Sequence, residues 1–347
     1  MRILSLFDGM ACGMIAMQLA GVQVESYDAY EIDKYAVKTA QHNFPIIREH
    51  GDVFVADFTQ YEGVDFIVGG SPCTYWSIAQ KKNRETVASG MGWEHYSQYV
   101  RALREAKPKY FIYENNKSMS KQIRASIDEA FGFEAVCINS ALVSAQNRQR
   151  LYWVGKRNAD GTYSKVNVEQ PEDRGILLKD VLDSAVAWRN KTNTLTSVET
   201  DNRVAEPINT DANGKAFCVT SRHYKGFGNN PGKCLEKHRD SMVAEPINVT
   251  ADGKEISIYE VRDGKITIKG KQYPIKLRDG YYIIRKLTVS ECKRLQTVPE
   301  WYDFSCVSNS QAYKMLGNGW TCEVIKHLID SCLNEKATDF DEQCRLF

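Results

Sequence analysis

Over its first 160 residues the chain alternates short apolar runs with segments of helical composition, and this alternation limits the possible folds more than any other feature. Strands that alternate with helices predict a mostly parallel sheet covered on both faces, an α/β doubly wound, Rossmann-like fold. The expected strands are 2–7, 24–32, 64–70, 109–115, 134–143 and 150–158, and the expected helices are 14–19, 33–44, 96–106 and 121–131.

The character of the sequence changes at about residue 185. Asn, Thr, Gly and Asp become frequent, and the phrase VAEPIN occurs at 204–209 and again at 243–248. Two copies are too few for a solenoid, so we interpret them as a duplicated hairpin element. The stretch 255–285 alternates apolar and polar residues around Asp-Gly turns, as β-hairpins do. This region is therefore expected to form a β-rich lobe.

Helical patterns return near the C-terminus, at 288–298 and within 312–333. In the second of these, an apolar stripe at helical spacing includes Cys332, which we interpret as a core residue. The chain is expected to leave its α/β domain and return to it. The predicted boundaries are 1–184 and 286–347 for the α/β domain and 185–285 for the inserted β-rich domain.

Composition narrows the class of protein. The formal net charge is +1, so any binding of a polyanion must use local patches. The apolar run Ile3–Phe7 ends at Asp8 and is too short for a secretory signal, and no run approaches the length of a membrane span. We expect a cytoplasmic protein. The ten cysteines form no CxxC pair, which argues against a zinc site, and we expect no metal.

The loop after the first strand, FDGMACG at 7–13, places small residues where backbone can approach a ligand. Loops at the carboxyl ends of parallel strands bind cofactors in such sheets. The loop matches neither the G-x-G-x-x-G fingerprint nor a phosphate loop, and taken alone it is equally typical of a tight turn. Glu31, after the second strand, suits a ribose diol, and Asp52 suits an exocyclic amine. Together they favour S-adenosylmethionine over NAD.

Cys73 follows a strand, two glycines and a proline in the stretch GGSPC. A thiolate at such a position is a candidate nucleophile if its surroundings permit ionisation. Glu114, in YENN at the end of a later strand, is expected at the same sheet edge. Taken alone, an acidic residue at the end of a strand is simply exposed to solvent. In QNRQR, Gln146, Arg148 and Arg150 point to one face if the segment is extended. These residues suggest a charged pocket for an anion or a polar base.

With these phrases together, the sequence resembles the DNA (cytosine-5) methyltransferases. The matching phrases, in chain order, are LFDGMACG, YEIDKYA, GGSPC, ENN, QNRQRLYWVG, RKLTVSECKRLQTVPE and LGNGW, which span residues 6–320. The ordered set is specific, whereas SPC or QxRxR alone would be weak. The resemblance implies the class I methyltransferase fold with an inserted target-recognition domain. It also implies a role in DNA methylation and restriction–modification, in a prokaryotic or viral setting.

The resemblance further implies roles for individual residues. Cys73 is expected to be the nucleophile, Glu114 to hold and protonate N3 of cytosine with Asn115 supporting its loop, and the two arginines Arg148 and Arg150 to position the pyrimidine and the catalytic loop. S-adenosylmethionine is the expected cofactor and S-adenosylhomocysteine the product. The residues expected to line the cofactor site are Phe7, Asp8, Gly9, Gly13, Glu31, Ile32, Asp52, Val53, Pro72 and Asn318, with Ile32 packed on the adenine ring.

The chemistry explains why these groups are needed. C5 of cytosine is a poor nucleophile, and addition of a thiolate at C6 with a proton at N3 makes it electron-rich. It can then take the methyl group, after which loss of the C5 proton and of the thiolate restores the ring. Because the base cannot react inside a stacked duplex, it must be flipped out.

Two positions depart from the family pattern. Ala11-Cys12 stand where many members have glycines, and both are small. Asn116 stands where valine usually follows Glu-Asn, which places a polar group near the cofactor or base; a tolerated replacement is the simpler interpretation.

The expected partner is double-stranded DNA, bound by a protein that is monomeric by default. Basic residues after Cys73 suit a loop that closes on phosphates, although a solvated charge run is the default interpretation. Basic and aromatic residues within 221–239 are the other candidate contacts. The expected DNA-binding residues are Lys81, Lys82, Arg84, Arg222, Tyr224, Lys225, Lys233 and Arg239. A family member acting on RNA and a relative without catalysis are the alternatives, and the retained Cys73 and Glu114 argue against the second.

Overall fold

A computed structural model describes residues 1–78, 80, 82–183, 191–192, 194–195, 203–208, 258–268 and 270–344. The chain forms two compact units. The larger unit contains Met1–Ile176, Asn193–Glu199 and Cys292–Phe347, and the smaller contains Leu177–Thr192 and Thr200–Glu291.

The larger unit is built on one sheet with strand order β3-β2-β1-β4-β5-β7-β6, and β8 pairs with β7. The first five strands of that order are parallel, whereas β7 is antiparallel to β5, β6 and β8. The strands are β1 (Arg2–Leu6), β2 (Ser26–Tyr30), β3 (Ile47–Glu49), β4 (Phe66–Gly69), β5 (Tyr110–Asn116), β6 (Val136–Asn139), β7 (Gln149–Arg157) and β8 (Tyr163–Lys165). The predicted fold class is confirmed.

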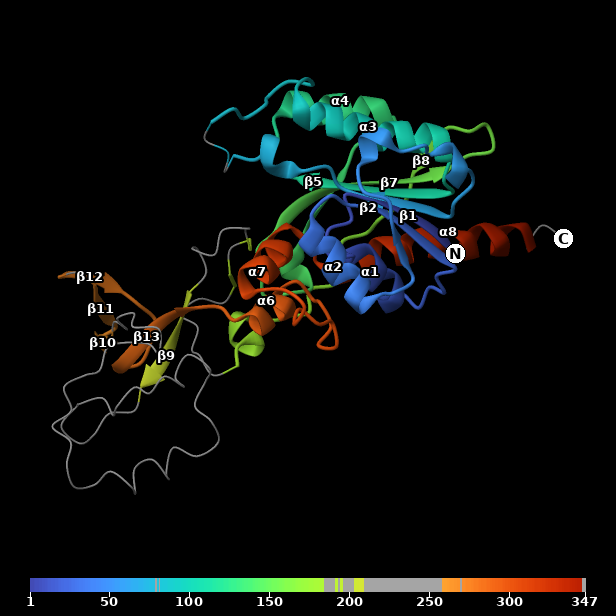
Figure 1. The fold of residues 1–347 in the computed structure, drawn as a ribbon. Coiled ribbons are helices and arrows are strands. Elements are labelled where there is room, and N and C mark those ends of the chain that lie inside the picture. The colour runs from blue at the N-terminus through green and yellow to red at the C-terminus, as the bar shows by residue number, and fades with distance from the viewer. Residues whose placement is uncertain are drawn as a thin grey trace. The chain divides into compact units, whose positions relative to one another are not determined.

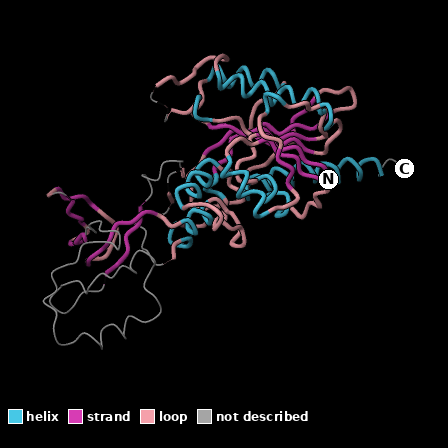
Figure 2. The backbone as a smooth tube through the Cα atoms, viewed as in Figure 1, coloured by secondary structure: helices cyan, strands magenta, loops and turns pink. Residues whose placement is uncertain are grey.

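Helices cover both faces of this sheet, with α3 and α4 on one side and α1, α2 and α8 on the other (Figure 1 and Figure 2). In α3 the apolar stripe of Tyr96, Tyr99 and Leu103 is buried against the sheet, as the spacing predicts. The helices are α1 (Cys12–Leu19), α2 (Lys34–Asn43), α3 (Met91–Ala106), α4 (Lys121–Phe131), α6 (Val289–Leu295), α7 (Asn309–Asn318) and α8 (Cys322–Cys344). None of the described helices is long and apolar enough to span a membrane.

Several element boundaries differ from the expectation: α3 begins at Met91 and not at residue 96, and the short strands β3 and β8 were not expected. The predicted strand 134–143 stops at Asn139, because the Asn139 side chain accepts a hydrogen bond from the amide of Ala141 and caps a short 3-10 turn, Ser140–Leu142. The C-terminal segment forms two helices, α7 and α8, that are interrupted around Gly319.

The smaller unit contains a five-stranded sheet of order β12-β11-β10-β13-β9. Its strands are β9 (Arg203–Ile208), β10 (Ile258–Arg262), β11 (Lys265–Ile268), β12 (Lys271–Pro274) and β13 (Gly280–Lys286), all antiparallel. Asp263 and Gly264 both have positive φ, 51° and 66°, in the tight turn between β10 and β11. The hairpins predicted for 255–285 are thus confirmed over the described residues of that stretch, 258–268 and 270–285. The first VAEPIN copy lies in β9, and the second, 243–248, lies outside the described residues.

Candidate active site

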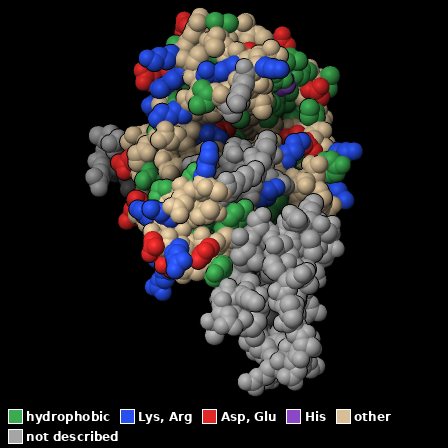
Figure 3. All heavy atoms as spheres, turned by 90° about the vertical axis from the view of Figure 1, so that its left-hand side faces the viewer, with side chains coloured by type: hydrophobic (Ala, Val, Ile, Leu, Met, Phe, Trp, Pro, Cys, Tyr) green, Lys and Arg blue, Asp and Glu red, His purple; other side chains and the backbone are tan. Residues whose placement is uncertain are grey.

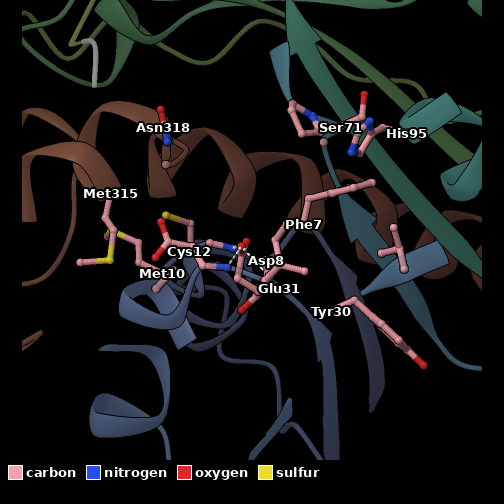
Figure 4. Close-up of a pocket in the computed structure, with 18 of the residues that line it drawn as sticks. Phe7, Asp8, Met10, Cys12, Tyr30, Glu31, Ser71, His95, Met315 and Asn318 are labelled. Carbon is pink, nitrogen blue, oxygen red and sulfur yellow. Dashed lines mark hydrogen bonds between the residues drawn. The ribbon is translucent and has the colours of Figure 1, made fainter. Parts of the chain in front are cut away.

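A cavity of about 290 Å³ opens at the carboxyl edge of the parallel strands in the larger unit. Figure 4 shows the first loop and Glu31 grouped together, with Met315 and Asn318 contributed by α7 and with Ser71 and His95 contributed by the loop after β4 and by α3. Of the expected cofactor residues, the cavity is lined by Phe7, Asp8, Gly9, Glu31, Ile32, Asp52, Val53, Pro72 and Asn318. Cys73 and Glu114 line the same cavity.

Gly13 is the one expected cofactor residue that does not line this cavity. It lies in α1, where a Cβ atom would come within 2.7 Å of the Tyr27 hydroxyl. The helix therefore packs closely on the sheet at this point. Gly13 therefore permits the close packing beneath the first loop and does not form part of the cavity surface.

The first loop has a strained backbone. Phe7 and Ala11 adopt φ of 58° and 62°, which L-residues rarely adopt, and Gly9 between them has φ of 61°. The amide of Gly9 donates to Glu31 Oε2 at 2.8 Å, and the amide of Phe7 donates to the carbonyl of Tyr30. Such strain is characteristic of ligand-clamping loops.

Glu31 is held by backbone amides. Its Oε1 accepts from Ile32 N and Asp33 N, each at 2.8 Å, while Oε2 accepts from Gly9 N. Oε2 retains a lone pair for a hydroxyl of a ligand. Ile32 beside it is 74% exposed, a large apolar surface next to a polar cavity. Asp52 uses Oδ1 to cap the amide of Phe54.

Asp8 is buried beneath the loop. Burial raises the pKa of Asp8 to about 6, although hydrogen bonds from Ser5 and Tyr27 act in the opposite direction. Nearby Glu49, at the end of β3, has its pKa raised to about 8 by burial and by the charges of Asp8 and Glu31. No local pattern in the sequence indicates that these three carboxyl groups lie close together.

Cys73 begins a short 3-10 turn, Cys73–Tyr75, directly after Pro72. Burial, and next the negative charge of Glu114, raise the pKa of the Cys73 thiol, whereas Arg150 and Arg148 lower it. The free protein therefore holds a thiol at neutral pH, and the arginines reduce the free energy needed to ionise it.

Glu114 lies in β5, and both of its carboxylate oxygens have donors. Arg150 Nε is 3.0 Å from Oε1, and the indole N–H of Trp320 donates to Oε2 at 3.0 Å. The antiparallel pairing of β5 with β7 places Arg150 opposite Asn116, two residues from Glu114 and on the same face of the sheet. A cysteine, a carboxylate and a guanidinium are thus assembled at one end of the cavity.

Arg148 is used differently from Arg150. Its guanidinium is buried and donates to the carbonyls of Leu195, Gly317 and Gly319. Burial, and next the charge of Arg150, lower its pKa to about 10. Gln146 also contacts Leu195, so both side chains point to one side although β7 begins only at Gln149.

Asn116, the unusual residue after Glu-Asn, is also buried. Its amide Nδ2 donates to the carbonyl of Cys73 at 3.2 Å, and its Oδ1 accepts from Ser118 Oγ at 2.7 Å. Valine could make neither bond. In this chain the position therefore ties the end of β5 to the turn that carries the cysteine.

The comparisons with known proteins identify the family. A family model described as C-5 cytosine-specific DNA methylase matches residues 1–334. The chain belongs to this family.

Individual relatives cover different shares of this chain. The orphan methyltransferase M.SPRI of Bacillus phage SPR is 35% identical over 170 residues, which are 45% of this chain and 38% of the phage protein. That match therefore spans less than half the length of the relative. The type II methyltransferase M.FnuDI of Fusobacterium nucleatum is 24% identical over 353 residues, covering 98% of this chain and 96% of that protein. The crystal structure of S. pombe Dnmt2 methyltransferase has the same fold, with a TM-score of 0.57 and 13% identity, over 96% of this chain and 98% of that one.

Several residues that line the cavity were not indicated by any pattern in the sequence. His95 lies among the rings of Phe7, Phe54 and Tyr75, with centroid distances of 5.9, 5.2 and 5.8 Å, and its Nδ1 donates to the carbonyl of Met91. Lys314 of α7 pairs with Asp33 at 2.7 Å, and both line the cavity. These contacts join distant segments, so a local pattern could not indicate them; only the phrase LGNGW pointed to Trp320.

Of the expected DNA-binding residues, Lys82 and Arg84 lie in the part of the chain that the structure describes. Lys82 is exposed, whereas Arg84 donates to the carbonyls of Trp76 and Ser118 and so ties the loop after Cys73 to the end of β5. Figure 3 shows basic and acidic side chains interspersed on the face that it presents, as the net charge of +1 implies. Lys81, Arg222, Tyr224, Lys225, Lys233 and Arg239 lie outside the described residues. No group of three or more His, Cys, Asp or Glu in the described part could hold a metal ion.

Proposed function

We propose that this chain transfers a methyl group from S-adenosylmethionine to C5 of a cytosine flipped out of double-stranded DNA, through a transient bond between Cys73 Sγ and C6. The observation that carries the proposal is that Cys73 and Glu114 line one cavity together with the strained first loop and Glu31. The family to which the chain belongs supports the same reaction.

The residues present fit the cofactor. Glu31 offers a fixed carboxylate oxygen to a ribose hydroxyl, and Ile32 offers an apolar surface to a purine ring. Phe7 and Asn318 line the remaining walls. When bound, S-adenosylmethionine supplies an electrophilic methyl group on a sulfonium sulfur. The protein residues bind and orient it beside the cysteine.

The cysteine and the glutamate perform complementary steps. The Cys73 thiol gives its proton to solvent, and the thiolate forms a bond to C6 while Glu114 gives a proton to N3. The ring then has an enamine whose C5 carbon takes the methyl group. The C5 proton passes to solvent, the N3 proton returns to Glu114, and departure of the thiolate restores aromaticity. The thiolate then regains a proton from solvent, so both groups return to their starting states.

Arg150 supports both groups at once. Its charge lowers the pKa of Cys73, and its Nε holds Glu114 Oε1 at 3.0 Å. A guanidinium is suited to this double task because it stays charged and has fixed donor directions. We assign Arg150 to positioning and electrostatic support, and Arg148 to holding the turn at Gly317–Gly319.

For DNA, we propose that residues 185–285 form a target-recognition domain and that Lys81, Lys82, Arg84, Arg222, Tyr224, Lys225, Lys233 and Arg239 contact the duplex. Phosphate contacts would position the protein, and contacts to base edges would select the sequence. The names of the relatives, an orphan and a type II methyltransferase, place comparable proteins among modification enzymes.

Covalent trapping tests the reaction directly. Duplex DNA with 5-fluorocytosine cannot lose its C5 substituent as a proton, so the adduct with Cys73 should persist and migrate as one species. The Cys73→Ala variant should form none, whereas Cys137→Ala, at a partly buried cysteine in β6, should behave as the native protein. Methylation of DNA at the native rate by Cys73→Ala would refute the assignment. Methyl transfer to structured RNA but not to duplex DNA would favour the RNA alternative.

A further inference from the structure

Trp320 is a residue of the cavity that the proposed reaction does not yet use. It follows Asn318 and Gly319 after α7, and it lines the same cavity as Cys73 and Glu114. We propose that Trp320 is a positioning residue that fixes the Glu114 carboxyl group and directs its proton toward N3 of the base. The inference rests on the proposed function, because it assumes that Glu114 protonates the cytosine.

The orientation of the Glu114 carboxylate is set at both of its oxygens. The terminal torsion of a glutamate side chain is broad, so a carboxylate held by one donor can rotate. Here Arg150 holds Oε1 and the indole holds Oε2, each at 3.0 Å, so the plane of the carboxylate is fixed from both ends. On a third side lies Gly70, where even a Cβ atom would come within 2.9 Å of Oε2. The carboxyl group therefore has little freedom to move away from the cavity.

The two donors also restrict where a proton on Glu114 can point. Both the indole N–H and the guanidinium are donors that cannot accept a hydrogen bond. When Glu114 is protonated, its O–H can point at neither of these two neighbours. The proton must point along a remaining lone-pair direction toward another acceptor. N3 of a cytosine placed in the cavity is such an acceptor, so the two donors select the direction of transfer.

The indole of Trp320 carries no net charge, and this affects whether Glu114 can hold a proton. A second cation on Oε2 would stabilise the ionised carboxylate so strongly that Glu114 would hold no proton to give to the base. The indole orients the oxygen without adding a charge. Trp320 thus supplies orientation, while Arg150 supplies the only positive charge that touches this carboxylate among the ion pairs of the described residues.

Trp320 is itself held by a buried polar network. Arg148 donates to the carbonyls of Gly317 and Gly319, and Gln296 Nε2 donates to those of Leu316 and Gly319. Four donor contacts thus fix the backbone immediately before the tryptophan. Since buried and satisfied networks are rigid, the position of the indole follows from the position of this turn. Arg148 therefore acts on Glu114 at a distance, through Trp320.

A double-mutant cycle tests the inference. Rates of methyl transfer to duplex DNA are measured in single turnovers with enzyme in excess, for Trp320→Phe, Glu114→Gln and the double variant. If the indole acts through Glu114, Trp320→Phe should slow transfer ~10–100-fold in the native background but less than ~3-fold in the Glu114→Gln background. The KM for S-adenosylmethionine should stay within about twofold, because the change concerns proton transfer and not cofactor binding.

Two controls separate the possible outcomes. Trp301→Phe alters a tryptophan that is 53% exposed and lies outside the cavity, and it should leave the rate unchanged. Trp320→His retains an N–H donor and should recover part of the rate that Trp320→Phe loses. Equal losses from Trp320→Phe in both backgrounds, or a raised KM with an unchanged rate, would overturn the inference alone. A native rate for Glu114→Gln would instead overturn the role of Glu114 in the proposed function.

Discussion

Replacement of Gly70 by alanine would test how tightly Cys73 and Glu114 are coupled. A Cβ atom at this position would lie 2.7 Å from the carbonyl oxygen of Glu114 and 2.9 Å from its Oε2. The backbone of β5 cannot rotate away like the end of a flexible side chain. Either β5 or the loop that carries Cys73 must therefore move.

The size of the movement follows from the distance. Ordinary contact begins at 3.4 Å, so relief of the contact with the carbonyl requires a shift of about 0.7 Å (3.4 − 2.7). Overpacking of this kind costs ~1–3 kcal/mol of stability. A misplacement of ~1 Å can cost ~100-fold in rate, so we expect Gly70→Ala to lower the rate of methyl transfer ~10–100-fold.

The assay pairs single-turnover methylation with thermal unfolding. Gly132→Ala is the matched control, because Gly132 ends α4 with φ of 80° and a Cβ atom there would meet no atom within 4 Å. This variant should lose ~1–2 kcal/mol of stability and keep its rate at a temperature where it remains folded. If Gly70→Ala methylates DNA at the native rate, the close approach of the loop to Glu114 does not constrain the reaction.

Groups next to the cysteine and the first loop should also respond to substitution. Asn116→Val removes the hydrogen bonds to Cys73 and Ser118. It should lower stability by ~1–2 kcal/mol, measured by denaturant unfolding, and slow methyl transfer a few-fold, measured in single turnovers. An unchanged rate would show that the hydrogen bond to Cys73 is not needed for the reaction. The rate should rise with pH through the neutral range as more of the Cys73 thiol ionises. Because Arg150 lowers the pKa of Cys73, Arg150→Met should move this rise to higher pH, and Arg150→Lys should move it less. Coincident pH–rate profiles for the three proteins would contradict the electrostatic role. Glu49 has a pKa of about 8 in the native state, above its ordinary value of 4.5. Between pH 4.5 and pH 8 the native state therefore holds a proton that the unfolded chain has lost. The stability contributed by this group falls as the pH rises through that range. Glu49→Gln should therefore flatten the fall and gain ~1–2 kcal/mol at pH 8, after allowance for partial exposure, and unfolding curves that keep the native slope would refute this.

The sequence predicted those parts of the structure that depend on local pattern. The apolar runs located most strands of the main sheet, and the position of a residue at the end of a strand was enough to place Glu31, Cys73 and Glu114 at one edge. What it could not predict are contacts between distant segments. Trp320 meets Glu114 across 206 positions, and Lys314 meets Asp33 across 281. No period or propensity encodes such pairs.

The use of Arg148 illustrates the same limit. Residue type and spacing suggested a cation facing the pocket, but they gave no indication that the guanidinium also satisfies the carbonyls at Gly317 and Gly319. A helix end leaves carbonyls without intrahelical partners, and α7 ends at Asn318. The need for a hydrogen-bond donor at these carbonyls can be recognised only when the end of α7 is known to lie beside residue 148.

Gln146 has a consequence for protein engineering. Its Oε1 accepts from the amide of Leu195, and its Nε2 donates to the carbonyl of Leu295. One buried side chain thereby joins two segments of the larger unit, Asn193–Glu199 and Cys292–Phe347, between which the chain runs through residues 200–291 of the smaller unit. If residues 185–285 select the target sequence as proposed, chimaeras that exchange this segment should preserve Gln146 and place their crossovers between Leu195 and Leu295.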